Sequence, residues 1–342
     1  MTAVTLTLPY VLPAPHTASH FASTMQAQQM LKYHSVGSYY TGTHFPAETL
    51  RSALAYEHRP GDVFIVTYPK SGTTWMQCIL YQIYTDAAPL TSIRDFAEQL
   101  PFLERTGGEG LSDLPRPGSA IKTHMLYNQD RVSQKAKYIY IARNPYDVCV
   151  SFFNHYKHLP VYQFEDGTFE QFFEQFMCGD VDFGDYFDHL LSWYEHRDDP
   201  NVLFVTYEDL KKDTRFWVQK VADFVGHQFG DKLRRHPHVM DRILDASSLA
   251  NVRELVRLEK DYQRKVIMET PKDRMPRWAA LYLDMGGGLL KKPAAGEFVR
   301  KGIVGDWKNY LTDAQFQRLE RKFRERCNGT DAMKLWKDLD MC

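Results

Sequence analysis

The run DVFIVTYPKSGTTW at residues 62–75 decides how this chain folds. Its first half, Asp62 to Tyr68, is a short β-branched and aromatic stretch bounded by Gly61 and Pro69, which predicts a buried strand. From Thr74 to Tyr84 apolar residues recur at helical intervals, so a helix follows. PKSGTT is therefore the turn between a strand and a helix, where phosphate groups bind.

The same strand and helix unit returns further along the chain. Tyr138 to Ala142 is a second buried strand, and Asn144-Pro145 supplies the N-cap and first-turn proline of a helix that runs to about Lys157. Two more strands are expected at 120–125 and 202–207, and more helices at about 168–178, 184–197, 214–225 and 312–326. Strands that alternate with helices predict an α/β fold with a central, mostly parallel sheet flanked by helices.

Two parts of the chain lack clear periodicity. We expect residues 1–60 to be an irregular lead-in and residues 268–299 to be a mobile loop, because GGG stands at 286–288 and KKPAAG at 291–296. The chain shows no internal repeat and no low-complexity tract. Residues 1–342 are therefore predicted to form a single domain.

The composition excludes several classes of partner. Lys and Arg total 42 and Asp and Glu 43, so no overall field favours nucleic acid or an anionic membrane, and any anion site must be local. The N-terminal residues lack the basic and apolar regions of a secretion signal, and no stretch approaches about 20 apolar residues, so we expect a soluble, cytoplasmic protein. Five scattered cysteines without C-x-x-C spacing suit a reducing compartment and offer no metal site.

The segment TYPKSGTTW at 67–75 has the chemistry of a phosphate cradle. Gly72 permits close backbone approach to an anion, Lys70 adds a point charge, the two threonines add hydroxyls, and the helix offers unpaired N–H groups. The pattern differs from a Walker motif, because Lys70 precedes the glycine with only Ser71 between them. A kinase or GTPase is disfavoured accordingly.

The segment IKTH at 121–124 brings a cation and a base together. Strand side chains alternate, so Lys122 and His124 share one face. The ordinary pKa of histidine, about 6.5, suits a base that takes a proton near neutral pH. The residues alone leave a purely structural histidine open as well.

Two further segments carry basic residues at the ends of expected elements. Arg143 of RNPYDVCVS stands at the carboxyl end of a strand, where open α/β sheets bind ligands, and Ser151 lies in the next helix. The alternative for Arg143 is a salt bridge with Asp147. In RKGIVGDWK at 300–308, two basic residues precede two glycines, and a solvated loop is the alternative.

The order and wording of these segments resemble the cytosolic sulfotransferase family. From about residue 60 to 312 the chain carries TYPKSGTTW, KTH, an Arg and a Ser eight residues apart, TYEDLKK at 206–212 and RKGxxGDWK in family order. The resemblance implies a single α/β domain with a P-loop-like phosphosulfate-binding turn. It also implies transfer of a sulfuryl group from 3′-phosphoadenosine 5′-phosphosulfate (PAPS) to a hydroxyl or amine of a small molecule, without a metal ion.

The resemblance further implies a role for each matching position. His124 is expected to be the general base, Lys122 to stabilise the transferring group, and Lys70 to face the bridging oxygen that leaves with the phosphate. The residues expected to hold the 5′-phosphosulfate and the adenine are Lys70, Ser71, Gly72, Thr73, Thr74 and Trp75, with Tyr207, Ser247, Ser248 and Leu249 near the base. The residues expected to bind the 3′-phosphate are Arg143, Ser151, Arg300, Lys301 and Gly302.

Aromatic residues are expected to enclose a phenol-like or catecholamine-like acceptor. By resemblance the acceptor site includes Phe102, Phe152 and His155, with Phe153 and Tyr156 beside them. Ordinary core packing is the alternative for each of these aromatic residues. The chain departs from many phenol-type members after PFLE, where Arg105 replaces a second aromatic residue, so a different acceptor preference is open.

Three competing functions and the oligomeric state stay open. A nucleotide kinase would need magnesium, a non-catalytic binder of adenosine phosphates would have lost the chemistry, and a Golgi carbohydrate sulfotransferase would carry a membrane anchor. The expected partner is a small-molecule acceptor, with no nucleic acid and no membrane. The positions that match the family's dimer motif are Lys308, Thr312, Asp313 and Gln317. A charge at Asp313, where the family has valine, predicts a monomer or a weak homodimer.

Overall fold

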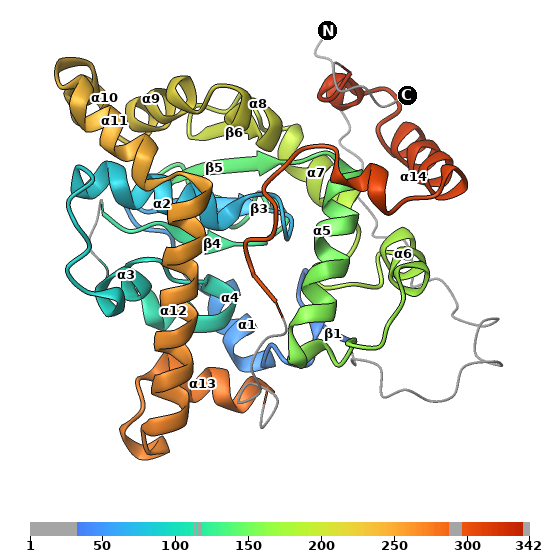
Figure 1. The fold of residues 1–342 in the computed structure, drawn as a ribbon, viewed down its shortest axis with the longest axis horizontal. Helices are drawn as coiled ribbons and strands as arrows, with labels where there is room; N and C mark the ends of the chain where they lie inside the picture. The colour runs from blue at the N-terminus through green and yellow to red at the C-terminus, as the bar shows by residue number, and fades with distance from the viewer. Residues whose placement is uncertain (1–32, 113, 115–117, 287–295, 338–342) are drawn as a thin grey trace, which may run out of the picture. The chain divides into compact units, whose positions relative to one another are not determined.

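Four parallel strands form the centre of the fold (Figure 1). The computed structural model describes residues 33–112, 114, 118–286 and 296–337. In the sheet the order is β4-β3-β5-β6, with β3 at Val63–Thr67, β4 at Ile121–Thr123, β5 at Lys137–Ala142 and β6 at Val202–Thr206. Every pairing in this sheet is parallel, which confirms the predicted α/β architecture.

Helices cover both faces of this sheet, because the central strands are apolar on both sides. Val63 and Ile65 of β3 pack into a core with α2 and α9. Phe64 and Val66 point to the other face and join an aromatic core with α5 and α7. The helices are α1 Ala47–Leu54, α2 Thr73–Thr85, α3 Ile93–Gln99, α4 Leu103–Thr106, α5 Pro145–His158, α6 Phe169–Cys178, α7 Tyr186–Tyr194, α8 Tyr207–Lys212, α9 Thr214–Val225, α10 His227–Arg235, α11 Pro237–Ala246, α12 Leu249–Glu269, α13 Arg277–Gly286 and α14 Asp313–Arg326.

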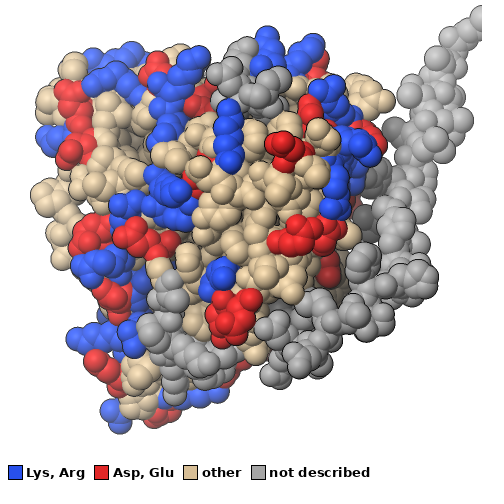
Figure 2. Space-filling view, turned by 45° about the vertical axis from the view of Figure 1, so that its right-hand side comes forward, with Lys and Arg blue, Asp and Glu red and all other residues tan. Residues whose placement is uncertain are grey.

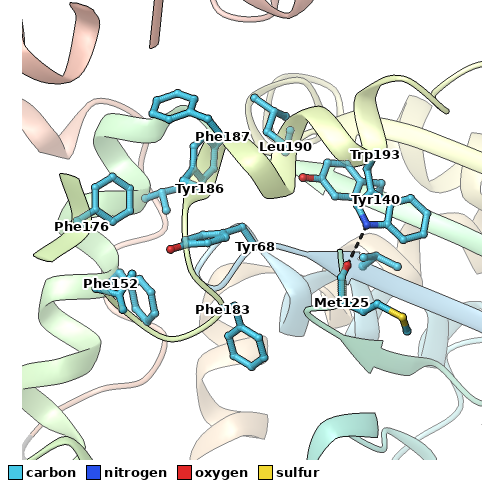
Figure 3. Close-up of a cluster of buried hydrophobic side chains, with 14 of the residues drawn as sticks. Tyr68, Met125, Tyr140, Phe152, Phe176, Phe183, Tyr186, Phe187, Leu190 and Trp193 are labelled. Atoms are coloured by element: carbon cyan, nitrogen blue, oxygen red, sulfur yellow. Dashed lines mark hydrogen bonds between the residues drawn. The ribbon is translucent and has the colours of Figure 1, made fainter. Parts of the chain in front are cut away.

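The aromatic core packs around Tyr68, the residue that precedes the phosphate turn (Figure 3). Tyr68, the last residue before Pro69, is 1% exposed and packs edge-on against Phe152 and Tyr186. On the same side the indole N–H of Trp193 donates to the backbone carbonyl of Met125 at 2.9 Å, one residue past His124. Large rings thus hold the ends of two neighbouring strands in place, and with them the residues that follow those ends.

Two segments expected to be irregular contain regular structure. Within the lead-in, β1 (Tyr33–Val36) and β2 (Tyr39–Gly42) form an antiparallel hairpin, and helix α1 follows. Strands of four residues carry too few positions for a period to show in the sequence. Of the expected loop at 268–299, residues 277–286 form α13, and 287–295 lie outside the described residues. The single-domain organisation of residues 1–342 stays a prediction.

Candidate active site

A cavity of about 590 Å³ opens at the carboxyl ends of the four parallel strands. The segment that follows each strand contributes to its lining: Lys70 after β3, His124 after β4, Arg143 after β5 and Tyr207 after β6. Open α/β sheets bind ligands at this edge, because helix N-termini and loop side chains converge there. Segments far apart in the sequence therefore meet in one place.

The phosphate turn has a backbone that only certain residues tolerate. Gly72 has φ of +105°, and a Cβ there would lie 2.9 Å from the ring of Tyr207, so glycine is required. Lys70 also lies in the left-handed region with φ of 71°. At the helix start, the hydroxyls of Thr67 and Thr73 hydrogen-bond at 2.7 Å and tie the strand end to the first turn.

Arg143 links the turn to the C-terminal basic segment. Its guanidinium donates to the carbonyls of Lys70 and Ile303, each at 3.1 Å, and stacks 4.4 Å from the centre of the Tyr207 ring. The alternative salt bridge to Asp147 is present only as a long contact of 3.8 Å. The Nε of Arg143 is buried without a hydrogen-bond partner among the described residues. The side chain is held firmly and keeps one donor for a ligand.

The residues expected around the adenine gather at the start of α2 and α12. The indole N–H of Trp75 donates to the carbonyl of Ser247 at 2.9 Å, which fixes the plane of the ring. Leu249 is 39% exposed and lines the cavity, so it is not a core residue. A Cβ on Gly302 would lie 2.6 Å from Leu249, so the RKG segment passes directly against it.

Residues 300–302 line the cavity, but the two basic ones also have an internal partner. The side chains of Arg300 and Lys301 both reach Asp306, which is buried, at 2.5 and 2.7 Å. Gly302 has φ of +61°, which favours glycine. The structure therefore supports part of the alternative interpretation, in which these cations stabilise their own loop.

His124 is held in one tautomer by the backbone. Its Nδ1 lies 2.7 Å from the carbonyl oxygen of Thr67, so Nδ1–H donates there and Nε2 keeps a free lone pair. Burial, and then the charge of Lys122, hold the pKa of His124 well below its ordinary value. The imidazole is therefore neutral at neutral pH and able to accept a proton.

Glu104 holds the backbone of His124 in place and was not among the functional residues predicted from the sequence. Its carboxylate accepts hydrogen bonds from the backbone N–H of His124 at 2.6 Å and from the hydroxyl of Thr123 at 2.8 Å. Glu104 is fully buried, and burial raises its pKa to about 7. The only signal was a carboxylate in the otherwise apolar PFLE.

Two lysines, Lys70 and Lys122, line the cavity and lie near enough for the charge of Lys122 to act on Lys70. Burial, together with the charges of Lys122 and Arg143, lowers the pKa of Lys70 to about 7. Burial also lowers the pKa of Lys122 to about 7, followed by the charges of Lys260 and Arg105. The ammonium of Lys122 lies 4.3 Å from the centre of the Phe102 ring. The concentration of like charge fits a site that receives an anion.

The aromatic wall differs in part from the expected one. Phe102 and His155 line the cavity as predicted, and Phe152 touches it although it is fully buried. Phe153 and Tyr156 lie in the core and do not line it. Aromatic residues that line the cavity but were not predicted from the sequence are His44, Phe45, Tyr162, Phe183 and Phe298. Phe102 and Phe183 enclose the imidazole of His124, at ring distances of 5.2 and 4.8 Å.

The remaining predicted residues fall in the same region. Thr73, Thr74, Ser151, Ser247 and Ser248 line the cavity. Ser71 does not, and its buried hydroxyl has no partner among the described residues. In the described part of the chain, no three His, Cys, Asp or Glu side chains gather as a metal site requires. No described helix combines the length and apolar character needed to cross a membrane.

Comparison with known proteins shows which family this chain resembles. A family model described as "Sulfotransferase domain" matches residues 60–331. Sulfotransferase 1 family member D1 of Mus musculus is 33% identical over 81% of this chain and 87% of its own length. Amine sulfotransferase of Oryctolagus cuniculus is 32% identical over 82% of this chain and 85% of its own. A crystal structure of mouse sulfotransferase SULT7A1 complexed with PAP has a TM-score of 0.63 at 29% identity, covering 90% of this chain and 98% of that one.

Proposed function

The chain belongs to the sulfotransferase family, and on that premise we propose that it transfers a sulfuryl group from PAPS to a hydroxyl or amine of a small molecule. One observation carries the proposal best. The backbone carbonyl of Thr67 fixes His124 in a neutral tautomer whose Nε2 is free to accept a proton, and His124 and Lys70 of the phosphate turn line the same cavity. A base for the acceptor and a cradle for the donor are thus combined.

The residues present fit the donor. The Nε of Arg143 and the Ser247 hydroxyl belong to residues that line the cavity and lack hydrogen-bond partners among the described residues, and anionic oxygens would satisfy them. We assign the phosphosulfate to the turn at 70–74, the adenine to Trp75 and Leu249, and the 3′-phosphate to Arg143, Ser151 and the backbone at 300–302. Because the side chains of Arg300 and Lys301 already pair with Asp306, we expect Arg143 to carry more of the 3′-phosphate binding than they do.

The chemistry is an in-line displacement at sulfur. The donor supplies a sulfuryl group bonded to a phosphate oxygen. His124 Nε2 takes the acceptor proton as the acceptor oxygen or nitrogen forms its bond to sulfur and the bond between sulfur and the bridging oxygen breaks. Glu104 positions the backbone of His124, and Phe102 and Phe183 exclude water from the imidazole.

The lysines stabilise the charge that moves during transfer. Lys122 faces the oxygens of the transferring group, and Lys70 faces the oxygen that leaves with the phosphate. Both lysines gain a full charge when an anion enters, because their pKa values of about 7 in the free protein rise beside a negative group. Two ammonium groups thereby provide the charge that a divalent metal provides in phosphoryl transfer.

Radiolabelled PAPS tests the function directly. We expect label to pass to members of a panel of phenols, catecholamines, steroids, fatty alcohols and amines in the presence of excess chelator. A strict requirement for magnesium would indicate a kinase-type reaction instead. Tight binding of adenosine 3′,5′-bisphosphate without transfer to any acceptor would indicate a non-catalytic binder.

The oligomeric state and the cytoplasmic localisation stay predictions. Asp313 is exposed at the first turn of α14, where Thr312 caps the helix. Burying this carboxylate in a small interface would be costly without a cationic partner. We therefore expect sedimentation at micromolar concentration to show mainly monomer, and a tight dimer whose interface includes Asp313 would contradict this.

A further inference from the structure

A second cavity of about 470 Å³ adjoins the first beside Lys122. It lies between α3, α4 and α12 and is lined mainly by residues of those helices and of the segment before α4. Six residues line both cavities and so mark the passage between them: Thr74, Phe102, Arg105, Lys122, Lys260 and Phe298. Three of the six are cations, and none is a carboxylate.

The first cavity carries more positive charge than the donor uses. Eight basic residues line it, and no Asp or Glu does so in the part of the chain that the structure describes. Across the face in Figure 2, by contrast, acidic and basic side chains are interspersed. The proposed function assigns Lys70, Lys122 and Arg143 to the donor, and the side chains of Arg300 and Lys301 pair with Asp306. Lys211, Arg105 and Lys260 remain.

Two of the remaining cations lie at the passage. Lys211 lines the first cavity and not the second, so it lies away from the passage. Burial, and then the charge of Arg143, lower its pKa. Lys260, on α12, lies 5.4 Å from the centre of the Phe298 ring, and the same ring has Lys70 at 4.2 Å. Lys260 and Arg105 are also the two charges that contribute most to lowering the pKa of Lys122, so both lie near its ammonium.

The carboxylates of the second cavity are not among the residues that line both cavities. Asp95, Glu98 and Glu259 line the second cavity and not the first. Glu98 pairs with Arg94 at 2.8 Å, and Glu259 accepts a hydrogen bond from Gln263 at 2.7 Å. Arg94 compensates the charge of Glu98, but Gln263 is neutral, and Glu259 is near enough to Lys122 to act against the lowering of its pKa. The three cations that line both cavities still outnumber this carboxylate.

We propose that the acceptor is itself an anion, a phenol or alcohol whose carboxylate or comparable group binds Arg105 and Lys260 at the passage while its hydroxyl reaches His124. The inference rests on the proposed function and names its substrate class. Phe102 and Phe298 flank the passage and would contact the apolar body of such a molecule. The two half-buried cations would hold the negative group of the acceptor, as Lys70 and Lys122 would hold that of the donor.

A matched set of acceptors tests this proposal. The probes are 3-(4-hydroxyphenyl)propionate, its neutral amide and the cation tyramine, assayed with saturating PAPS. We expect kcat/KM to be at least about tenfold higher for the carboxylate than for the amide, mostly through KM, with tyramine lowest. Lys260→Met should remove most of that preference, and Lys260→Glu should favour tyramine over the carboxylate.

Lys265→Met is the control, because Lys265 lies on the same helix but is exposed and lines neither cavity. The control should keep the wild-type preference. Equal kcat/KM for the carboxylate and the amide in an active wild-type enzyme would overturn the inference and leave the proposed function intact. Absence of transfer to every acceptor would instead refute the proposed function. If Lys260→Met weakened bisphosphate binding and kept the acceptor preference, Lys260 would belong to the donor site and the inference would be wrong.

Discussion

The donor side and the acceptor side of this cavity are built in different ways. On the donor side, the phosphate turn and Arg143 directly follow parallel strands, and each belongs to a short motif that is readable in the sequence. On the acceptor side, Phe45, Phe102, Tyr162 and Phe183 come from four separate segments. On the proposed assignment, the anion site is encoded locally, by backbone geometry and charge, whereas the acceptor wall exists only after tertiary folding.

His124 stands where the two sides meet, so its loss should have the largest effect. We expect His124→Ala to lower kcat by about a hundredfold or more, because proton abstraction from the acceptor is lost. Calorimetry should show nearly unchanged binding of adenosine 3′,5′-bisphosphate, since the donor site lacks this side chain. His238→Ala, a change at an exposed histidine, is the control and should retain full activity. Turnover near the wild-type value in His124→Ala would refute the assignment.

A substitution of Arg143 tests whether this residue of a short sequence motif binds the donor directly. We expect Arg143→Ala to weaken binding of adenosine 3′,5′-bisphosphate by more than about tenfold and binding of adenosine 5′-phosphate much less, because only the first ligand has a 3′-phosphate. Arg143→Lys should recover part of the loss. Arg143 also holds the carbonyls of Lys70 and Ile303, so equal losses for both ligands would mean that it acts by supporting the loops.

The sequence sufficed where chemistry and local structure coincide. The strand and helix pattern around PKSGTT predicted the turn, and the requirement for glycine at position 72 follows from its left-handed backbone. Lys122 and His124 line the cavity although β4 ends at Thr123, one residue before the histidine. The parallel sheet was predictable because both faces of β3 are apolar.

The sequence failed where position depends on the fold as a whole. Phe45 lies in a segment expected to be irregular, and Phe183 follows a loop with no periodicity, yet both rings reach His124 or its neighbour Phe102. Phe153 and Tyr156 adjoin Phe152 in the sequence, but their direction around α5 takes them into the core. Lys260 lies in a region whose helical periodicity was masked by its many charged residues.

The pH dependence should separate the base from the lysines. We expect kcat/KM to fall at low pH as His124 gains a proton. This fall should occur well below pH 6.5, because burial lowers the pKa of His124. Activity should also fall as the pH rises through about 7, where Lys70 and Lys122 lose their charge in the free enzyme. Lys122→Arg keeps a charge at every working pH, so it should retain more of its activity at pH 9 than the wild type does. An unchanged alkaline limb in an active Lys122→Arg would show that Lys122 does not cause it.

The smallest expected effect concerns Leu249. This residue stands where a second aromatic ring would otherwise pack against the adenine, opposite Trp75. Stacking of a base on an aromatic side chain contributes roughly 1 to 3 kcal/mol by alanine substitution, so Trp75→Ala should weaken bisphosphate binding more than Leu249→Ala does. Leu249→Phe should leave binding equal or slightly tighter. Because Leu249 is 39% exposed, the larger ring should leave the melting temperature nearly unchanged, although it must avoid the backbone of Gly302. A clear loss of thermal stability with unaltered affinity would remove Leu249 from the binding site, and Trp75 would then hold the adenine alone.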